Sequence, residues 1–190
     1  MEKLVDNAVN EESVDLESKK DIGRNRFVKR YGVYTVAFIF PIIIMLCIYI
    51  TKDIYPFGDE MYLRSDCYHQ YAPFLQEFYN KIHNSGSLFY SWNVGSGSNF
   101  LAMMAYYFAS PLNWILLLIP AGHITEMVGF FIILKTAICS LDFTIYCTSH
   151  FHTRKMSAAA GGIFYALSAY MAAYSWNIMW LDCLMLLPIV

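Results

Sequence analysis

The sequence predicts an all-α integral membrane protein that crosses the bilayer several times. Hydrophobic residues make up 57% of the 190 positions, which is high for a soluble domain. Three apolar runs are long enough to cross a hydrocarbon core of roughly 30 Å, which takes about 20 helical residues. A long polar and aromatic segment, residues 51–123, separates the first two runs, and we expect it to form one large loop.

The N-terminal segment, residues 1–30, is polar and is expected to lie in the cytoplasm. Its first part, to about residue 20, is acidic and is typical of a disordered tail. Immediately before the first apolar run lies a cluster of cations: Lys19, Lys20, Arg24, Arg26, Lys29 and Arg30. The positive-inside rule places such a cluster in the cytoplasm, so the following loop faces outward. The run itself is too long and too far from the start to be a cleavable signal peptide.

The first two expected spans carry local signals of their own. The first, residues 33–50, is uncharged and has Pro41 in its middle, which a membrane helix tolerates as a bend. The second, residues 124–147, contains Lys135 and Asp142, and a charge inside a span indicates a functional site. Lys135 could attract the phosphate of a lipid-linked donor, or it could pair with an acid on a span beyond this chain. Asp142 lies on the same helix face about two turns away, too far for an adjacent pair.

The third expected span, residues 157–174, is rich in small residues that allow close helix packing. After a polar break a further apolar run begins, with a fourth span expected to start near residue 183. The chain stops inside this run, so we expect residues 31–190 to be the first part of a larger transmembrane domain. Asn177 and Asp182 follow the third span and are expected to emerge on the same side as the large loop.

Charge placement also restricts residues 101–120. Arg154 and Lys155 mark a second cytoplasmic segment, directly after the span at 124–147. The chain therefore crosses an odd number of times between the large loop and this segment, and one span suffices. Pro111 interrupts the apolar stretch at 101–120, so we expect that stretch to lie along the interface or to enter the membrane and return.

An aromatic stripe predicts an interfacial helix within the large outer loop. Aromatic and aliphatic side chains recur at helical spacing at Tyr68, Tyr71, Leu75, Phe78, Tyr79 and Ile82. Tyrosine favours the headgroup region, so this face is expected to lie on the membrane surface. A helix whose aromatic face closes a protein surface would explain the stripe equally well. Pro73 falls in the second turn, so the helix is either kinked there or begins again near Ala72.

Asp66 and Asp59 are the candidate catalytic acids of this loop. Asp66 lies one helical turn before Gln70, so the two side chains share a face. A carboxylate near a helix N-terminus is favoured in its charged form, and it could accept a proton as a general base. Stabilisation of the helix start is the simpler role for Asp66. Asp59 and Glu60 could orient a sugar or serve a divalent cation, although adjacent loop acids are often only solvated.

Residues 91–100 read SWNVGSGSNF and mix glycines, amides and aromatic rings. Aromatic faces beside amides suit sugar rings, and glycines let backbone N–H groups approach a phosphate. Trp92, Asn93 and Asn99 are the candidate binding residues of this segment. A flexible turn is the alternative.

Several stretches of the chain, taken together, resemble the YfhO family of bacterial multi-spanning membrane proteins. They are residues 64–74, 90–93, 95–100 and 105–113, then Lys135, and finally residues 177–182. The resemblance runs from about residue 30 to the end of the chain, and so long an ordered series is more specific than any single motif. Ser96 departs from it, because the family's glycine motif often has a larger apolar residue.

The resemblance implies a multi-spanning helical GT-C-like fold, of which this chain would be a truncated N-terminal part. GT-C glycosyltransferases use polyprenyl-phosphate sugars outside the cytoplasmic membrane, and family members are implicated in adding sugars to teichoic acids. The implied partners are membrane lipid, the lipid-linked sugar donor and an envelope polymer acceptor, with no nucleic acid. Family members are several times longer, so this chain is expected to be inactive alone.

By the same resemblance, Asp66 is the first candidate for the catalytic acid and Asp59 is the second. The candidate substrate-binding residues are Gln70, Trp92, Asn93, Asn99, Tyr106, Tyr107, Lys135, Asn177 and Asp182. No metal site is expected, because the five cysteines lack metal-binding spacing, and a need for a divalent cation stays open. Two other functions stay open as well: a transporter or flippase of lipid-linked precursors, and a non-catalytic envelope assembly protein.

Overall fold

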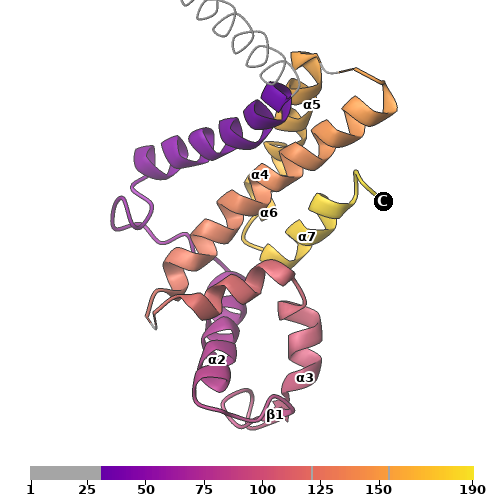
Figure 1. Cartoon of the computed structure of the whole chain (residues 1–190). Coiled ribbons are helices and arrows are strands. Elements are labelled where there is room, and N and C mark those ends of the chain that lie inside the picture. Colours follow the sequence, from indigo (N-terminus) through magenta and orange to yellow (C-terminus); the bar gives the residue numbers. More distant parts are fainter. Residues whose placement is uncertain (1–30, 121, 154) are drawn as a thin grey trace, which may run out of the picture.

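A computed structural model of the chain describes residues 31–120, 122–153 and 155–190. The expected disordered and basic segment 1–30, and Arg154 in the expected cytoplasmic segment, lie outside the described residues. Figure 1 shows long helices running alongside one another, and a lobe of shorter elements at one end of α4. We call residues 52–120 the lobe, and the remaining described helices the bundle.

Among the described residues, three helical segments are long and apolar enough to cross a membrane. They are the first helix (Tyr31–Thr51), α4 (Ile124–His150) and Met156–Tyr174, which comprises α5 (Met156–Ala166) and α6 (Ala169–Tyr174). These segments coincide with the three expected spans and confirm a multi-spanning, all-α membrane fold. The structure adds a break between α5 and α6, where Ser168 adopts an extended backbone.

Small residues join α4 to α5. Gly162 faces α4 so closely that an added Cβ atom would lie 2.2 Å from Thr144 Oγ1 and 2.3 Å from the Ser140 carbonyl oxygen. The Thr144 hydroxyl donates to the Ser140 carbonyl at 2.7 Å. Val33 of the first helix packs on the same end of the bundle, beside Ala158 of α5. The small residues therefore serve the close packing that the sequence predicts.

Helix α7 (Ile178–Leu186) packs against α4 and completes the described part of the bundle. Its start lies before residue 183, because Asn177 is the last residue with a non-helical backbone (φ −81°, ψ 71°) and helical geometry follows at once. Ile178 and Leu181 are buried against the bundle.

The lobe consists of η1 (Cys67–Tyr71), α2 (Ala72–His83), the strands β1 (Tyr90–Ser91) and β2 (Ser98–Asn99), α3 (Phe100–Met103), η2 (Met104–Phe108) and η3 (Pro111–Leu118). Near Pro73, where the sequence left a kink or a new helix start open, a π-helical turn gives way to α2 at Ala72, and Pro73 occupies the first turn of α2. The two strands pair antiparallel, with Tyr90 opposite Asn99. In Figure 1 the hairpin joins α2 to α3 at the end of the lobe that is remote from α4.

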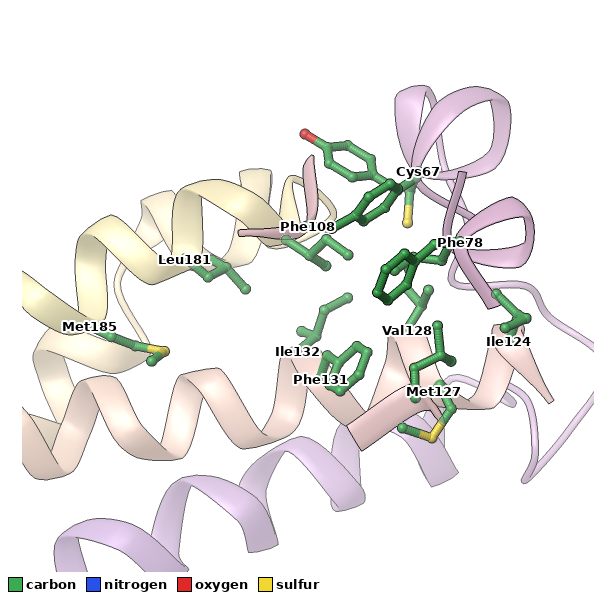
Figure 2. Close-up of a cluster of buried hydrophobic side chains, with 14 of the residues drawn as sticks. Cys67, Phe78, Phe108, Ile124, Met127, Val128, Phe131, Ile132, Leu181 and Met185 are labelled. Atoms are coloured by element: carbon green, nitrogen blue, oxygen red, sulfur yellow. The ribbon is translucent and has the colours of Figure 1, made fainter. Parts of the chain in front are cut away.

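The lobe and the bundle share one hydrophobic core. Figure 2 shows Phe78 and Phe108 of the lobe facing Val128 and Ile132 of α4, with Cys67 beside them. Burial raises the pKa of the Cys67 thiol to about 12, so it acts as a neutral filler. A shared core of this kind holds the lobe in one position against the bundle.

The aromatic stripe of the lobe is part of that core, which differs from the membrane-surface position that the sequence led us to expect. Leu75 and Phe78 are fully buried, as is Tyr71, whereas Tyr68 at the start of the stripe is exposed. The stripe therefore closes a protein surface, which is the second of the two explanations. The physical reason is that α4 and η3 supply an apolar surface for it within the same chain.

Residues 100–118 form no straight helix. The segments Phe100–Phe108 and Pro111–Leu118 meet at an angle of 106°. Pro111 begins η3 and cannot donate a backbone hydrogen bond, so the preceding Ser110 is extended. Such a bend fits a broken span as well as a segment that enters the membrane and returns, so the expectation that the stretch does not cross stays a prediction.

Candidate functional site

Asp66 immediately precedes η1, at the junction of the lobe and the bundle. Its carboxylate is half-buried and makes no capping bond to the backbone of the helix. Instead, the Gln70 side-chain amide donates to Asp66 Oδ1 at 3.3 Å, as expected for residues on one helix face. Gln70 Oε1 in turn accepts a hydrogen bond from the Tyr107 hydroxyl at 2.7 Å. The structure therefore brings together two elements of the lobe at this acid.

Asn177 joins the same cluster from the bundle. The Tyr71 hydroxyl donates to Asn177 Oδ1 at 3.1 Å, and the Tyr71 ring packs edge-on against Tyr107. Burial raises the pKa of Tyr71 above its ordinary value of 10.0, and Tyr107, Tyr106 and Asp66 add to the shift. The hydroxyl therefore stays protonated and remains a donor. The large loop and the residues after the third span, which the sequence predicts on the same side of the membrane, are therefore in direct contact here.

Tyr106 gives this cluster an open face. Its side chain is 62% exposed, and its ring packs edge-on against Tyr107 at 4.8 Å between centroids. We call Asp66, Gln70, Tyr71, Tyr106, Tyr107 and Asn177 the Asp66 cluster. Within the described residues Asp66 forms no ion pair.

Lys135 and Asp182 form a separate, deeper pair in the bundle. Lys135 is 1% exposed, and its Nζ donates to Asp182 Oδ2 at 2.7 Å and to the Ile178 carbonyl at 2.8 Å. The Ser110 hydroxyl donates to the other Asp182 oxygen at 2.8 Å. The partner acid of Lys135 therefore lies on α7 of this chain and not on a span beyond it. These bonds join α4, α7 and the start of η3, and they leave the ammonium group no open approach for a phosphate.

The hairpin residues lie at the other end of α2. Asn93 Nδ2 donates to Glu77 Oε2 at 2.9 Å, and Glu77 follows Asp66 by eleven residues, or roughly 16 Å of helix rise. Asn99 is occupied as the cap of α3, where its side chain accepts from the Ala102 N–H at 3.1 Å. Trp92 is 77% exposed. The structure therefore does not bring Trp92, Asn93 and Asn99 to Asp66.

The glycines of the hairpin shape its turn. Gly97 has a φ of +116°, and a Cβ atom there would lie 2.0 Å from the Tyr90 hydroxyl. Its N–H donates to the Val94 carbonyl at 2.9 Å, so it is already engaged in the turn. For residues 91–100 the sequence analysis left phosphate binding and a simple turn open, and the geometry of Gly97 fits the turn.

A buried acid that the sequence analysis did not single out holds the hairpin. Glu77 accepts hydrogen bonds from the Ser91 hydroxyl at 2.5 Å and from Asn93, and its carboxylate lies 3.5 Å from Lys81 Nζ. Burial by itself would raise the pKa of Glu77, but the bonds from Ser91 and Asn93 and the Lys81 charge outweigh it and lower the pKa below 4.5. The i,i+4 spacing of Glu77 and Lys81 was the available sequence signal.

Asp59 stands apart from these networks. It is exposed in the turn between the first helix and η1, and its side chain makes no hydrogen bond within the described residues. The neighbouring Glu60 N–H donates to the Asp53 carbonyl at 2.9 Å, which closes the turn. In the part of the chain that the structure describes, no three His, Cys, Asp or Glu side chains group as they would around a metal ion.

The fold and the cluster together define a multi-pass helical membrane protein with a polar site between its lobe and its bundle. The family model of the bacterial membrane protein YfhO matches residues 37–190 of the chain. The protein therefore belongs to the YfhO family. A search of curated proteins and a search of solved structures each found no match.

Proposed function

We propose that this protein carries the catalytic loop of a membrane glycosyltransferase. It would transfer a sugar from a polyprenyl-phosphate donor to an envelope polymer such as teichoic acid, at the outer face of the bacterial cytoplasmic membrane. The observation that carries the proposal is the Asp66 carboxylate, half-buried where the lobe meets the bundle and oriented by Gln70. Tyrosine rings and an amide beside a free carboxylate suit a sugar ring and its hydroxyl groups.

The proposed chemistry is an inverting transfer. The Asp66 carboxylate accepts the proton of the acceptor hydroxyl, whose oxygen forms a bond to the anomeric carbon of the donor sugar. The bond from that carbon to the phosphate oxygen breaks, and the lipid phosphate leaves with the electron pair. Gln70 holds the carboxylate in place, and the exposed Tyr106 provides a face for the sugar. Lys135 is buried and paired, so we assign it to the architecture and not to the leaving phosphate.

A flippase or transporter of lipid-linked precursors is the second candidate function. The observation that favours it is a crevice of about 890 Å³ between the first helix and the α5–α6 segment, where a lipid could reside. Transport would require such a crevice but no general base. The role of the Asp66 carboxylate therefore separates the two functions.

The test of the proposed function is Asp66→Asn introduced into the native chromosomal gene, in cells that have no other copy. We expect the sugar attached to envelope teichoic acid to fall by roughly 10²–10⁴-fold, the contribution of a general base, at an unchanged amount of membrane protein. The comparison variant is Asp59→Asn, at the second candidate acid; because Asp59 is exposed and lies apart from the Asp66 cluster, this change should leave the transfer intact. Unchanged glycosylation in Asp66→Asn would remove Asp66 from the mechanism and favour Asp59, transport or assembly.

A further inference from the structure

Part of the crevice of about 890 Å³ is lined by apolar side chains. Ile44 and Ile48 of the first helix line one side, and Met171 and Ala172 of α6 line the other. The first helix packs closely on α5 near Val33. Farther along the first helix, the helix that it faces is interrupted by the break between α5 and α6. A hydrocarbon chain can pack against the apolar side chains of a slot between two membrane-spanning segments.

The end of the crevice nearest the lobe is charged. Lys52 and Arg64 line it, together with Asp53 and Glu60. Within the described residues, neither Lys52 nor Arg64 forms an ion pair, although acids line the same rim. Two cations that have no ion-pair partner among the described residues, at the mouth of an apolar slot, match the charge of a lipid phosphate. Acids beside them can accept hydrogen bonds from the hydroxyl groups of a sugar.

The charged end of the crevice adjoins the Asp66 cluster. Ser175 and Trp176 line the crevice, and the next residue, Asn177, bonds to Tyr71 of the cluster. Arg64 lies two residues before Asp66, so their Cα atoms are at most about 7 Å apart. The Tyr62 hydroxyl is hydrogen-bonded to Ser175 and closes the crevice beside the cluster.

We infer that this crevice holds the polyprenyl chain of the donor, with its phosphate at Lys52 and Arg64 and its sugar toward Asp66. The inference rests on the proposed function and names the residues that bind its donor. It assigns to Arg64 the stabilisation of the departing phosphate, which the buried Lys135 cannot provide. A lipid in this position presents its headgroup to the cluster directly from the membrane.

The test is photo-crosslinking of the purified protein in phospholipid vesicles with a polyprenyl phosphate that bears a diazirine on its chain. We expect the label on peptides from the first helix and α6, and competition by unlabelled polyprenyl phosphate. Lys52→Gln combined with Arg64→Gln should reduce labelling about tenfold, the loss of roughly one charge-assisted bond. Ala172→Trp, which fills the slot, should reduce it as strongly. The controls are Lys155→Gln and Ala169→Trp, which lie outside the crevice lining and should label normally.

Two results would overturn the inference. One is labelling that is reduced neither by Lys52→Gln combined with Arg64→Gln nor by Ala172→Trp. If Ala172→Trp misfolds, the charge variant alone still decides this outcome. The other is equal competition by phosphatidylglycerol, which would make the crevice an ordinary phospholipid site. Asp66→Asn should retain full labelling, because the carboxylate is not needed to bind the chain. Normal labelling together with glycosylation that Asp66→Asn leaves unchanged in cells would therefore uphold the crevice and reject the transferase.

Discussion

Glu77 illustrates how one buried carboxylate positions a segment that is distant from it along the chain. Its two oxygens are occupied by Ser91 and Asn93, and Lys81 supplies the opposite charge. Lys81 also donates to the Tyr90 carbonyl at 2.9 Å, so the pair holds the hairpin at two points. Asp66, by contrast, has one amide neighbour and no cation within the described residues. At the scale of single residues, Glu77 holds the hairpin, whereas Asp66 has the role of general base only in the proposed function.

The hairpin is expected to loosen in acid because of Glu77. Its pKa is lowered in the folded protein, so its contribution is complete above about pH 4.5 and is lost as the pH falls through the lower folded value. Trp92 fluorescence, with the other tryptophans replaced by phenylalanine, should report this change. Glu77→Gln should cost about 1–3 kcal/mol and weaken the pH dependence. Glu60→Gln, at an exposed acid, should behave as the parent does; an identical pH profile in Glu77→Gln would contradict the assignment.

The elements of the bundle are joined in two physically different ways. Between α4 and α5 the contact depends on the absence of a side chain at Gly162. Between α4 and α7 it depends on the buried pair of Lys135 and Asp182. The α4–α5 contact depends on steric fit and the α4–α7 contact depends on charge, so each can be tested with its own variants.

Gly162→Ala is expected to separate α4 from α5. The added methyl group would lie 2.2 Å from Thr144 Oγ1 and 2.3 Å from a backbone oxygen that cannot move aside. Such overpacking costs about 1–3 kcal/mol, which should lower the thermal midpoint of the purified protein in detergent. Gly161→Ala is the matched control, because its methyl group would meet Phe143 at an ordinary 3.5 Å. Equal midpoints for the two variants would argue against the close contact.

Breaking one side of the Lys135–Asp182 pair should be worse than removing both charges. Asp182→Leu leaves a buried ammonium group without its counter-ion and should cost about 3–5 kcal/mol of stability. Combining it with Lys135→Met removes that charge and should recover most of the loss in the same detergent unfolding assay. Asp142→Leu serves as the control, since Asp142 has no ion-pair partner within the described residues. Additive effects of the two substitutions would mean that the pair is not coupled.

At the scale of the whole molecule, one hydrophobic core extends from the lobe into the bundle. Phe78 and Phe108 of the lobe meet Val128 of α4, and Leu181 of α7 belongs to the same core (Figure 2). The Asp66 cluster sits at this junction, where Tyr71 reaches Asn177. Because the lobe is attached to the bundle through this core, the Asp66 carboxylate stays in a fixed position relative to the ends of the spans. The proposed transfer depends on this fixed position, because Asp66, the acceptor hydroxyl and the anomeric carbon of the donor must be aligned with one another.

The lobe is expected to face outward and the α4–α5 connection to face the cytoplasm. In a background without the native cysteines, Ser87→Cys in the lobe should react with a membrane-impermeant maleimide on intact cells. Ser157→Cys, exposed at the start of α5, should react only after the cells are permeabilised. The reason is the concentration of cations before the first span and after the second. The opposite pattern of labelling would place the Asp66 cluster in the cytoplasm and exclude an outer-face transferase.

The spans, and a change in the helix near Pro73, could be predicted from the sequence because they depend on neighbouring residues. Apolar length sets a span, and Pro73 limits where a helix can begin. The shared face of Asp66 and Gln70 likewise follows from helix periodicity alone. The sequence by itself therefore determined that this is a multi-spanning helical membrane protein with an acid at the start of a lobe helix.

Only the tertiary structure decided which polar residues meet. Lys135 pairs with Asp182 across 47 positions, and Tyr71 meets Asn177 across 106. The tertiary structure also decided that the aromatic stripe is buried and that Asn93 and Asn99 serve the hairpin and α3. Hydropathy and periodicity are properties of adjacent residues, whereas these contacts depend on where the chain returns after each span. Their free energy comes from burying a polar group with one specific partner, and no local pattern names that partner.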